Sequence, residues 1–400
     1  MNRSALDRWV REQEGLNRLT RADIESVQLH KLNRLLKREQ KRGGFYKDRG
    51  LPEQLSRLSE LSGLPFTTEA DLKEQGNRMV LLSQSEIDRV RTEETSGTTG
   101  QAKRVYYSAA DNERTISFFA AGLSELVFAG EKTMICMPFS GPGGLGELIA
   151  EAVCRLGGIP LPVGIGKCYK ELLAVLDREQ PETFVGMPVP LLSLLRLRKE
   201  NSLRRALISA DACPDTVTAE IEERLGNRLY PHYGSRESGL GGAVTCPAFS
   251  GMHVRENDII AEIVDPLGRP LPAGAWGELV ITTIQADAMP LIRYRTGDYT
   301  RLMPNPCPCG SSLARLDQVT RLGEKSWMAE LDSQVFALQG LVDYGARLAN
   351  GVLHFWGCTA AECGPLPSVL LGYPVRWELR PVSDEDMPCY PAKRSILGSV

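Results

Sequence analysis

The sequence predicts an α/β fold with a large N-terminal domain, followed by a small α+β domain at the C-terminus. Between residues 92 and 209, short β-type runs alternate with helical runs, which is the pattern of βαβ units in a parallel sheet. From residue 258 to 283 the pattern changes to short strands separated by Gly and Pro turns, which indicates a β-rich subdomain. Beyond residue 321, one helix and three strand-like runs predict the small domain.

Length and composition indicate an ordinary globular protein with more than one domain. With 400 residues, the chain is long enough for two or three domains and a large buried core. Hydrophobic residues make up 42%, charged residues 24%, and the net charge is -3, so no basic excess favours nucleic acid or an anionic membrane. We therefore expect small-molecule partners and a cytoplasmic location, with a homodimer left open.

The elements of the large domain follow from hydrophobic spacing and turn residues. Leucines and isoleucines between charged residues predict one amphipathic helix over residues 22–42, which ends at Gly43. In the alternating part, strands are expected at residues 104–107, 133–137, 159–163 and 183–186. Helices between them are expected at residues 112–126, 147–156 and 172–179. Such sheets bind ligands beyond the carboxyl ends of their strands, which places the loops at 139–146 and 230–237 at the site.

The β-rich part and the small domain are predicted in the same way. Strand-like runs at residues 259–264 and 277–283 are separated by turn residues. A domain boundary is expected near Arg321, which gives an N-terminal domain of residues 1–320 and a cap of residues 321–400. In the cap, a helix is expected at 331–338 and strands at 341–348, 352–356 and 375–379.

Residues 95–103, Thr-Ser-Gly-Thr-Thr-Gly-Gln-Ala-Lys, are the most informative segment of the chain. Gly97 and Gly100 let backbone N–H groups approach phosphate oxygens closely, and Lys103 adds a positive charge on a flexible stem. Further side-chain donors are Ser96, Thr98 and Thr99. The segment therefore predicts a loop that binds a polyphosphate.

Two other phosphate-binding patterns fit less well. No segment matches Gly-x-x-x-x-Gly-Lys followed by Ser or Thr, because Gly166-Lys167 is followed by Cys168. A Gly-x-Gly-x-x-Gly pattern occurs at residues 141–146, after a strand-like run. A dinucleotide site also needs an acidic residue about twenty positions further on, where this chain has apolar residues, so a nicotinamide cofactor is disfavoured.

Two more motifs follow the hydroxyl-rich loop. Residues 233–237, Tyr-Gly-Ser-Arg-Glu, resemble the aromatic-Gly-x-Thr-Glu motif of the adenylate-forming enzymes, and residues 294–298, Tyr-Arg-Thr-Gly-Asp, resemble their Tyr-x-Thr-Gly-Asp motif. This superfamily comprises acyl-CoA synthetases, luciferases and peptide-synthetase adenylation domains. Within it, the chain most resembles the phenylacetate-CoA ligase family through residues 64–68, 71–72, 251–253, 290–294 and 307–310. The N-terminal domain is thus expected to be an adenylate-forming domain.

This resemblance implies an ATP-dependent carboxylate-CoA ligase for an aryl or related acid, acting through an acyl-adenylate and releasing AMP and pyrophosphate. By resemblance, Glu237 binds Mg²⁺, and Asp298 and Arg321 contact the ribose. Lys103 is a catalytic cation, and so is Lys393, which resembles only loosely the family's lysine near the C-terminus.

The remaining ligand contacts are also implied by the resemblance. The triphosphate would lie on residues 96–100, and the adenine on Tyr233, Gly234 and the segment Ser209, Ala210 and Asp211. The acid would be bound by Phe139, Gly141, Gly143 and Gly144, where glycines leave room for a planar ring.

Each assignment has a plainer alternative. Glu237 as a surface ion-pair partner, Asp298 as a turn residue and Tyr233 as a core aromatic residue all remain open. Lys103 and Lys393 are residues that are often simply solvated.

Three cysteines and one histidine form a candidate metal site. Cys246, His253, Cys307 and Cys309 are the ligand types of a closed, tetrahedral structural Zn²⁺ site, and the family has a similar order of Cys and His residues. Such a site would stabilise the β-rich part at about residues 240–320 and would not take part in catalysis. The alternative is four unrelated residues.

The chain also departs from the family pattern. Arg236 stands where the family has Thr, and residues 320–324 keep the arginine of the hinge motif but lack its aspartate. Coenzyme A as the acceptor is therefore the least secure part of the interpretation. Two alternatives remain: an adenylating enzyme that delivers the acyl group to a carrier protein or another nucleophile, and a nucleotide-binding regulator without turnover.

Overall fold

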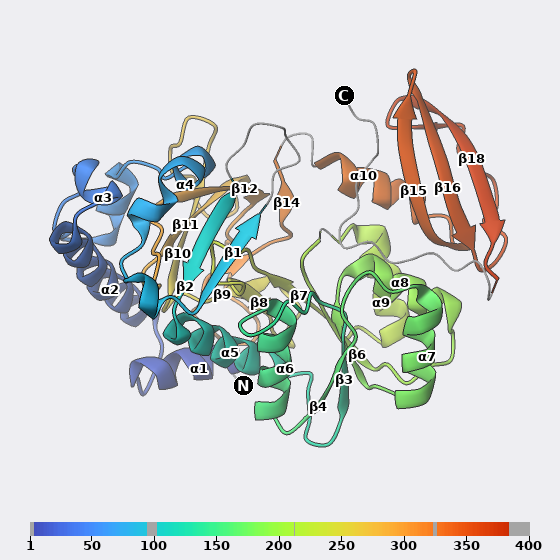
Figure 1. Ribbon diagram of the computed structural model, residues 1–400, viewed down its shortest axis with the longest axis horizontal. Coiled ribbons are helices and arrows are strands. Elements are labelled where there is room, and N and C mark those ends of the chain that lie inside the picture. The colour runs from blue at the N-terminus through green and yellow to red at the C-terminus, as the bar shows by residue number, and fades with distance from the viewer. Residues whose placement is uncertain (1–3, 94–101, 212, 323–325, 384–400) are drawn as a thin grey trace. The chain divides into compact units, whose positions relative to one another are not determined.

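The computed structural model describes residues 4–93, 102–211, 213–322 and 326–383 (Figure 1). The chain divides into two compact units. The first unit contains Met1–Glu125 and His232–Leu322, and the second contains Leu126–Pro231 and Gly323–Val400. Residues after 322 thus group with the second unit, and a separate cap of residues 321–400 stays a prediction.

The first unit begins with helices that pack around an apolar core. They are α1 (Ala5–Glu14), α2 (Arg21–Arg42), α3 (Phe45–Asp48), α4 (Glu69–Gln75) and α5 (Ala109–Leu123). The predicted helix at 22–42 is α2, which Thr20 caps by accepting a hydrogen bond from the Asp23 amide at 3.2 Å. It ends at Gly43, whose φ of 75° few other residues adopt.

The strands of the first unit form three antiparallel groups. The first is the ribbon β1 (Arg89–Glu93) and β2 (Lys103–Tyr107). The second has the order β10 (Ile259–Val264), β11 (Gly277–Thr283), β12 (Tyr294–Thr300) and β14 (Thr320–Arg321). The third has the order β13 (Arg315–Leu316), β9 (Met252–Val254), β8 (Ala243–Thr245) and β7 (Leu229–Tyr233). The predicted strands at 259–264 and 277–283 are β10 and β11.

The second unit contains the predicted parallel sheet, which confirms the βαβ interpretation. Its strands pair in the order β7, β6 (Arg205–Ile208), β5 (Thr183–Gly186), β3 (Lys132–Ile135) and β4 (Ile159–Pro162). Residues 229–231 of β7 pair with β6, and its residues 232–233 pair with β8. The helices of this part are α6 (Leu145–Arg155), α7 (Tyr169–Glu179), α8 (Pro188–Leu197) and α9 (Asp215–Leu225).

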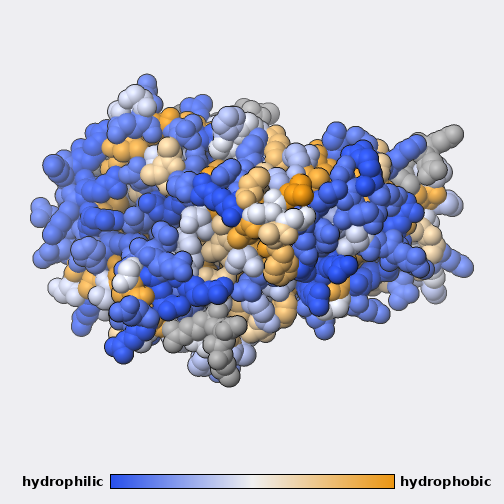
Figure 2. All heavy atoms as spheres, turned by 90° about the horizontal axis from the view of Figure 1, so that it is seen from below, coloured by the Kyte–Doolittle hydropathy of each residue, from blue (hydrophilic) through white to orange (hydrophobic). Residues whose placement is uncertain are grey.

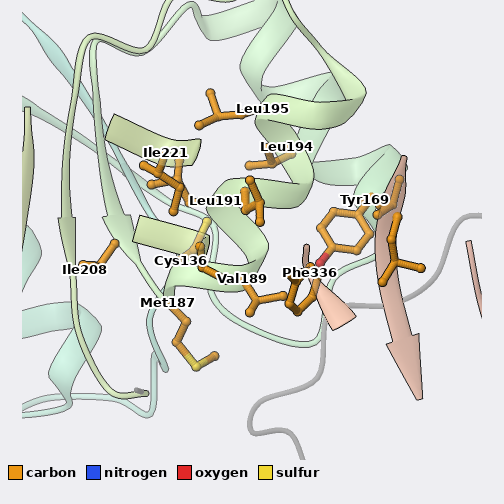
Figure 3. Packing of buried hydrophobic residues seen from close by; sticks show 14 of the residues in the cluster. Cys136, Tyr169, Met187, Val189, Leu191, Leu194, Leu195, Ile208, Ile221 and Phe336 are labelled. Carbon is orange, nitrogen blue, oxygen red and sulfur yellow. The ribbon is translucent and has the colours of Figure 1, made fainter. Parts of the chain in front are cut away.

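The core of the second unit is built largely on α8. Nine of its ten residues are buried, so apolar residues surround the helix instead of following one face. Figure 3 shows Leu191 and Leu194 of α8 close to Ile221 of α9 and Cys136, which follows β3. Because apolar and polar residues do not recur in α8 with the 3.6-residue period of an amphipathic helix, the sequence pattern did not predict α8.

The C-terminal part of the second unit consists of one helix and a four-stranded sheet. The elements are α10 (Ser326–Val335), β15 (Leu341–Ala349), β16 (Val352–Thr359), β17 (Val369–Leu370) and β18 (Tyr373–Pro381). Asn350 and Gly351 both have positive φ, 51° and 71°, and form the tight turn between β15 and β16. This mixed α+β composition agrees with the expectation, although α10 begins five residues before the predicted helix at 331–338.

The helices and one face of the surface were compared with what a membrane span requires. None of the helices in the described part of the chain combines the length and the apolar content needed to span a bilayer. The face seen in Figure 2 is covered mostly by hydrophilic residues.

Candidate functional site

The first unit brings Lys103 and Glu237 together. Lys103 begins β2 and Glu237 lies in the loop after β7, yet the Lys103 Nζ is 2.6 Å from the Glu237 Oε1. The side chains are only 10% and 7% exposed, so water screens the pair little. A lysine that simply extends into solvent is thereby excluded for Lys103 in this structure.

Asp298 on β12 connects two further predicted residues. Its Oδ2 accepts a hydrogen bond from the Tyr233 hydroxyl at 2.8 Å, and its Oδ1 lies 3.0 Å from the Arg321 Nη1. Burial and the Asp298 carboxylate raise the pKa of Tyr233 well above 10. The hydroxyl therefore stays protonated and donates the hydrogen bond to Asp298. Tyr233, Asp298 and Arg321 therefore form one connected polar group.

The 233–237 loop and β12 contact each other a second time. The Tyr294 hydroxyl at the start of β12 lies 3.5 Å from the Glu237 Oε1. Each of the two segments thus contributes one tyrosine and one carboxylate, and each tyrosine points to the carboxylate of the other segment. Sequence reasoning used Tyr294 as part of a motif but did not assign it this contact.

Gly234 and two serines fix the shape of this loop. A Cβ at position 234 would lie 2.0 Å from the Leu240 carbonyl oxygen, so only glycine fits there. The Ser238 hydroxyl accepts a hydrogen bond from the Ser235 amide at 2.8 Å. In addition, the Tyr107 hydroxyl donates to the Arg236 carbonyl oxygen. These contacts position Glu237 beside Lys103.

Several predicted ligand contacts belong to the second unit. Ser209 follows β6, where its amide donates to the Gly186 carbonyl at 3.0 Å, and Ala210 has a φ of 71°. Asp211 is half-buried beside them. Their predicted contact with adenine stays a prediction.

The glycine-rich loop before α6 also lies in the second unit. The Gly141 amide donates to the Glu147 carboxylate, and a Cβ at position 144 would lie 2.3 Å from the Glu147 Oε2. The Glu147 carboxylate thus already accepts the hydrogen bond of an amide that a dinucleotide phosphate would need as a donor. The contacts of the acid with Phe139, Gly141, Gly143 and Gly144 stay predictions.

Some predicted residues lie outside the described part of the chain. These are Ser96, Gly97, Thr98, Thr99, Gly100 and Lys393. Their assignment rests on the sequence alone.

The four candidate zinc ligands lie together in the first unit. Their ligand atoms are all within 4.8 Å of one another: the sulfurs of Cys246, Cys307 and Cys309 and a ring nitrogen of His253. Two contacts have the spacing of neighbouring ligands on one ion, 3.7 Å between the Cys246 and Cys307 sulfurs and 3.4 Å between the Cys309 Sγ and the His253 Nε2. Tetrahedral Zn²⁺ with ligand bonds of about 2.0–2.3 Å requires separations of about 3.5–3.8 Å. These two separations are close to the values that Zn²⁺ requires, and zinc binding by the cluster stays a prediction.

The environment of Cys309 favours a thiolate. Burial alone would raise its pKa, but hydrogen bonds from His253 and from the Ser311 amide outweigh this effect and lower the pKa to about 6. Burial raises the pKa of the Cys246 thiol instead, so that residue needs a cation nearby to lose its proton.

Comparison with known proteins first defines the class of protein. Residues 95–286 match the family described as AMP-binding enzyme. The phenylacetate-coenzyme A ligase of Pseudomonas putida is 31% identical over 314 residues, 72% of this chain and 70% of that protein. The corresponding ligase of Thermus thermophilus is 30% identical over 329 residues, 77% of this chain and 72% of that protein. The chain belongs to the phenylacetate-CoA ligase family, which confirms the resemblance drawn from its motifs.

Solved structures support the fold. A crystal structure of 2-hydroxyisobutyryl-CoA ligase in the postadenylation state, in complex with R3-HIB-AMP, has a TM-score of 0.78 and covers 95% of this chain and 90% of its own chain at 20% identity. An open conformation of that ligase, in complex with 2-HIB-AMP and CoA, has a TM-score of 0.69 and covers 82% and 83% of the two chains at 22% identity.

Proposed function

We propose that the chain is an ATP-dependent carboxylate-CoA ligase that acts through an acyl-adenylate. A carboxylate oxygen of the acid attacks the α-phosphorus of ATP, the bond to the β-phosphate oxygen breaks, and pyrophosphate leaves. The thiolate sulfur of coenzyme A then attacks the carbonyl carbon of the adenylate, and AMP leaves. Family membership supports the reaction class. The observation that carries the assignment to this site is the double contact between the 233–237 loop and β12.

Glu237 and Lys103 form the phosphate end of the proposed site. The Glu237 carboxylate offers the hard oxygen ligand that Mg²⁺ prefers, and the bound ion would neutralise charge on the phosphates. The Lys103 Nζ lies 2.6 Å from the Glu237 Oε1, so its ammonium group is close to any phosphate that approaches the carboxylate. When the nucleotide binds, Glu237 can thus contact Mg²⁺ and Lys103 can contact a phosphate, in place of their contact with each other.

Asp298 and Arg321 form the ribose end. Both carboxylate oxygens of Asp298 already have a partner, Tyr233 or Arg321, but each oxygen has a second lone pair that can accept a ribose hydroxyl. The two existing contacts fix the orientation of the carboxylate before the nucleotide arrives, which reduces the entropic cost of binding.

The remaining contacts are proposed from the family resemblance. The β- and γ-phosphates would contact residues 96–100, the adenine would contact residues 209–211, and the acid would contact residues 139–144. Lys393 in the cap of residues 321–400 would reach the reacting carboxylate. ATP and coenzyme A are metabolites of the cytoplasm, where we place the protein.

We also propose that Cys246, His253, Cys307 and Cys309 bind one structural Zn²⁺. The support is the spacing of their ligand atoms, together with the low pKa of Cys309. Four protein ligands leave no open coordination position, so the ion would connect the loops after β8 and β12 and would not contact the substrate.

Acid-dependent release of pyrophosphate tests the proposed reaction. Purified protein with ATP and Mg²⁺ should release pyrophosphate only when a suitable aryl or aliphatic acid from a panel is present. Glu237→Gln should lower kcat by roughly 100-fold, because a charge-stabilising group is lost. The control Glu151→Gln, which alters an exposed pair with Arg155 in the second unit, should retain full activity. No pyrophosphate release with any acid, together with no ATP binding, would overturn the assignment.

The acceptor of the acyl group is measured in the same reaction. Formation of acyl-CoA on addition of coenzyme A supports the ligase, whereas acylation of a carrier-protein thiol alone supports an adenylating enzyme that loads a carrier. Tight ATP binding without AMP formation would instead indicate a nucleotide-binding regulator.

A further inference from the structure

Helix α1 contacts the loop that contains two of the candidate zinc ligands. Asp7, in the first turn of α1, is completely buried and accepts a hydrogen bond of 2.8 Å from the Ser311 hydroxyl. Ser311 comes shortly after Cys307 and Cys309 in the chain, whereas 304 residues separate it from Asp7. The first helix is therefore attached to the cysteine loop by a contact that no sequence motif indicated.

Ser311 connects Asp7 to the candidate ligand Cys309. The Ser311 amide donates a hydrogen bond to the Cys309 sulfur. The Ser311 hydroxyl donates to Asp7 and accepts a hydrogen bond from the Leu313 amide at 3.2 Å. Because an ionised acceptor makes a stronger hydrogen bond than a neutral one, Asp7 is suited to hold this hydroxyl in place. One residue thus links the helix to a ligand atom.

The start of α1 also lies beside the cluster on another side. A cavity of about 200 Å³, part of it open to solvent, is lined by Ser4, Ala5 and Leu6 as well as by Cys246 and His253. The same helix therefore lies near ligands from three separate segments: the loop after β8, strand β9 and the cysteine loop.

Other contacts of α1 fix the position from which Asp7 reaches the loop. The Trp9 Nε1 donates to the Ser117 hydroxyl of α5 at 2.8 Å, and the Trp9 ring packs edge-on against Phe118 with ring centres 6.0 Å apart. At the end of α1, Glu14 accepts a hydrogen bond from the Lys31 Nζ at 2.5 Å. The helix is thus a firm support for the cysteine loop.

Outer contacts of this kind matter for metal sites. A histidine that binds a metal normally donates its second ring nitrogen to a carboxylate, a carbonyl or water, and this contact orients the ligand. The His253 Nδ1 is buried and has no hydrogen-bond partner among the described residues. The contact of Asp7 with Ser311 is therefore one route by which support from outside the ligand set reaches the cluster.

We propose that Asp7 is a positioning residue of the zinc site, and that zinc binding and the packing of α1 against the cysteine loop stabilise each other. This inference rests on the zinc site proposed above. Asp7 holds Ser311, Ser311 holds Cys309 where a ligand is needed, and a bound ion in turn fixes the loop that Asp7 contacts. By thermodynamic linkage, loss of one of these interactions weakens the other.

The zinc affinity of full-length variants tests this role. Competition with a chelator of known affinity gives the Kd for Zn²⁺ of the wild type, Asp7→Ala and Ser311→Ala. Each substitution should weaken zinc binding by about tenfold or more, the usual effect of removing an outer contact to a metal ligand. The double variant should bind zinc about as well as the weaker single variant, because both substitutions remove the same hydrogen bond.

Two further variants complete this test. Glu12→Gln, at an exposed position of the same helix, should bind zinc as the wild type does. If Asp7→Ala fails to fold, Asp7→Asn takes its place, because it removes the charge and keeps the size of the side chain.

Hydrogen exchange tests the linkage in the other direction. Removal of zinc from the wild type by the chelator should speed amide exchange in α1, because the loop that holds Asp7 loses its fixed position. Exchange in α7, which belongs to the second unit, should not change.

The outcomes separate this inference from the zinc proposal. A wild type that contains no zinc and binds none would overturn both. Wild-type zinc affinity in Asp7→Ala and Ser311→Ala, or exchange in α1 that does not respond to the chelator, would overturn the role of Asp7 and leave the zinc site standing. Additive losses in the double variant would show two unrelated structural effects and would also refute that role.

Discussion

The Tyr233 hydroxyl donates a hydrogen bond of 2.8 Å to the Asp298 carboxylate, although 65 residues separate the two in sequence. This contact joins the end of β7 to β12, and Arg321 extends it from the other side of the carboxylate. The residue expected to contact adenine thereby positions the residue expected to contact ribose. The proposed nucleotide site is therefore partly assembled before any ligand binds.

Tyr233→Phe should weaken ATP binding without disturbing the fold. Loss of one hydrogen bond to a charged group corresponds to about 1.5–3 kcal/mol, which we expect as a rise of roughly tenfold or more in the KM for ATP and less change in kcat. Steady-state kinetics at varied ATP concentration measure the effect. Tyr299→Phe is the control, because its hydroxyl makes no hydrogen bond to any residue that the structure describes. Equal effects of the two variants would argue against this role.

Lys103→Met should destabilise the protein in a Mg²⁺-dependent way. Removing one partner of a largely buried ion pair costs about 3–5 kcal/mol of unfolding free energy, because Glu237 then keeps an uncompensated charge. Mg²⁺ should restore part of this loss by binding Glu237. Urea unfolding with and without Mg²⁺ provides the measurement, with Lys73→Met as the control, since Lys73 pairs with the exposed Glu69. A Mg²⁺ effect of the same size in both variants would contradict the assignment of the metal to Glu237.

The cysteine and histidine cluster should contain one zinc ion per chain. Elemental analysis of purified protein should give a ratio near one, and Cys307→Ser should reduce it strongly because a sulfur ligand is lost. Cys154→Ser, at an exposed cysteine outside the cluster, should leave the ratio unchanged. Zinc content that is absent in the wild type, or that survives in Cys307→Ser, would refute the site.

Glu39 should make stability depend on pH. Burial raises its pKa from 4.5 to about 8, while Arg38 and Arg42 oppose the shift only in part. The folded state therefore keeps a proton on Glu39 that the unfolded chain releases. The contribution of this group to stability is fully present below pH 4.5 and is lost as the pH rises towards 8.

Glu39→Gln removes this ionisation and tests it. The difference in unfolding free energy between the variant and the wild type should change in favour of the variant by more than about 1 kcal/mol from pH 5 to pH 8. Urea unfolding at the two pH values measures the difference, and the exposed Glu53→Gln should show no such trend. A constant difference between Glu39→Gln and wild type across this range would contradict the raised pKa.

Elements with clear periodicity were predictable from the sequence, and others were not. The helix α2 and strands β5, β10 and β11 lie where amphipathic spacing or short β-type runs placed them. The helix α8 was missed because it is buried on almost every side, so its residues show no polar face.

The site shows the same division. The motifs identified Glu237 and Asp298 as candidates, because particular residue types stand at fixed spacing there. Tyr107 belongs to no motif, and only the packing of β2 against the loop after β7 makes it a neighbour of Glu237. Contacts of this kind depend on tertiary structure, which local patterns do not encode.

The carboxylate of Glu147 beside the Gly141 amide has a consequence for the acid. An anionic group that approached this loop would meet a like charge and would find its amide donor already in use. If the acid binds against this loop, as proposed, its uncharged end would face the loop and its carboxylate would point away. Preference among acids at this position would follow ring size and shape, since charge near the ring is rejected.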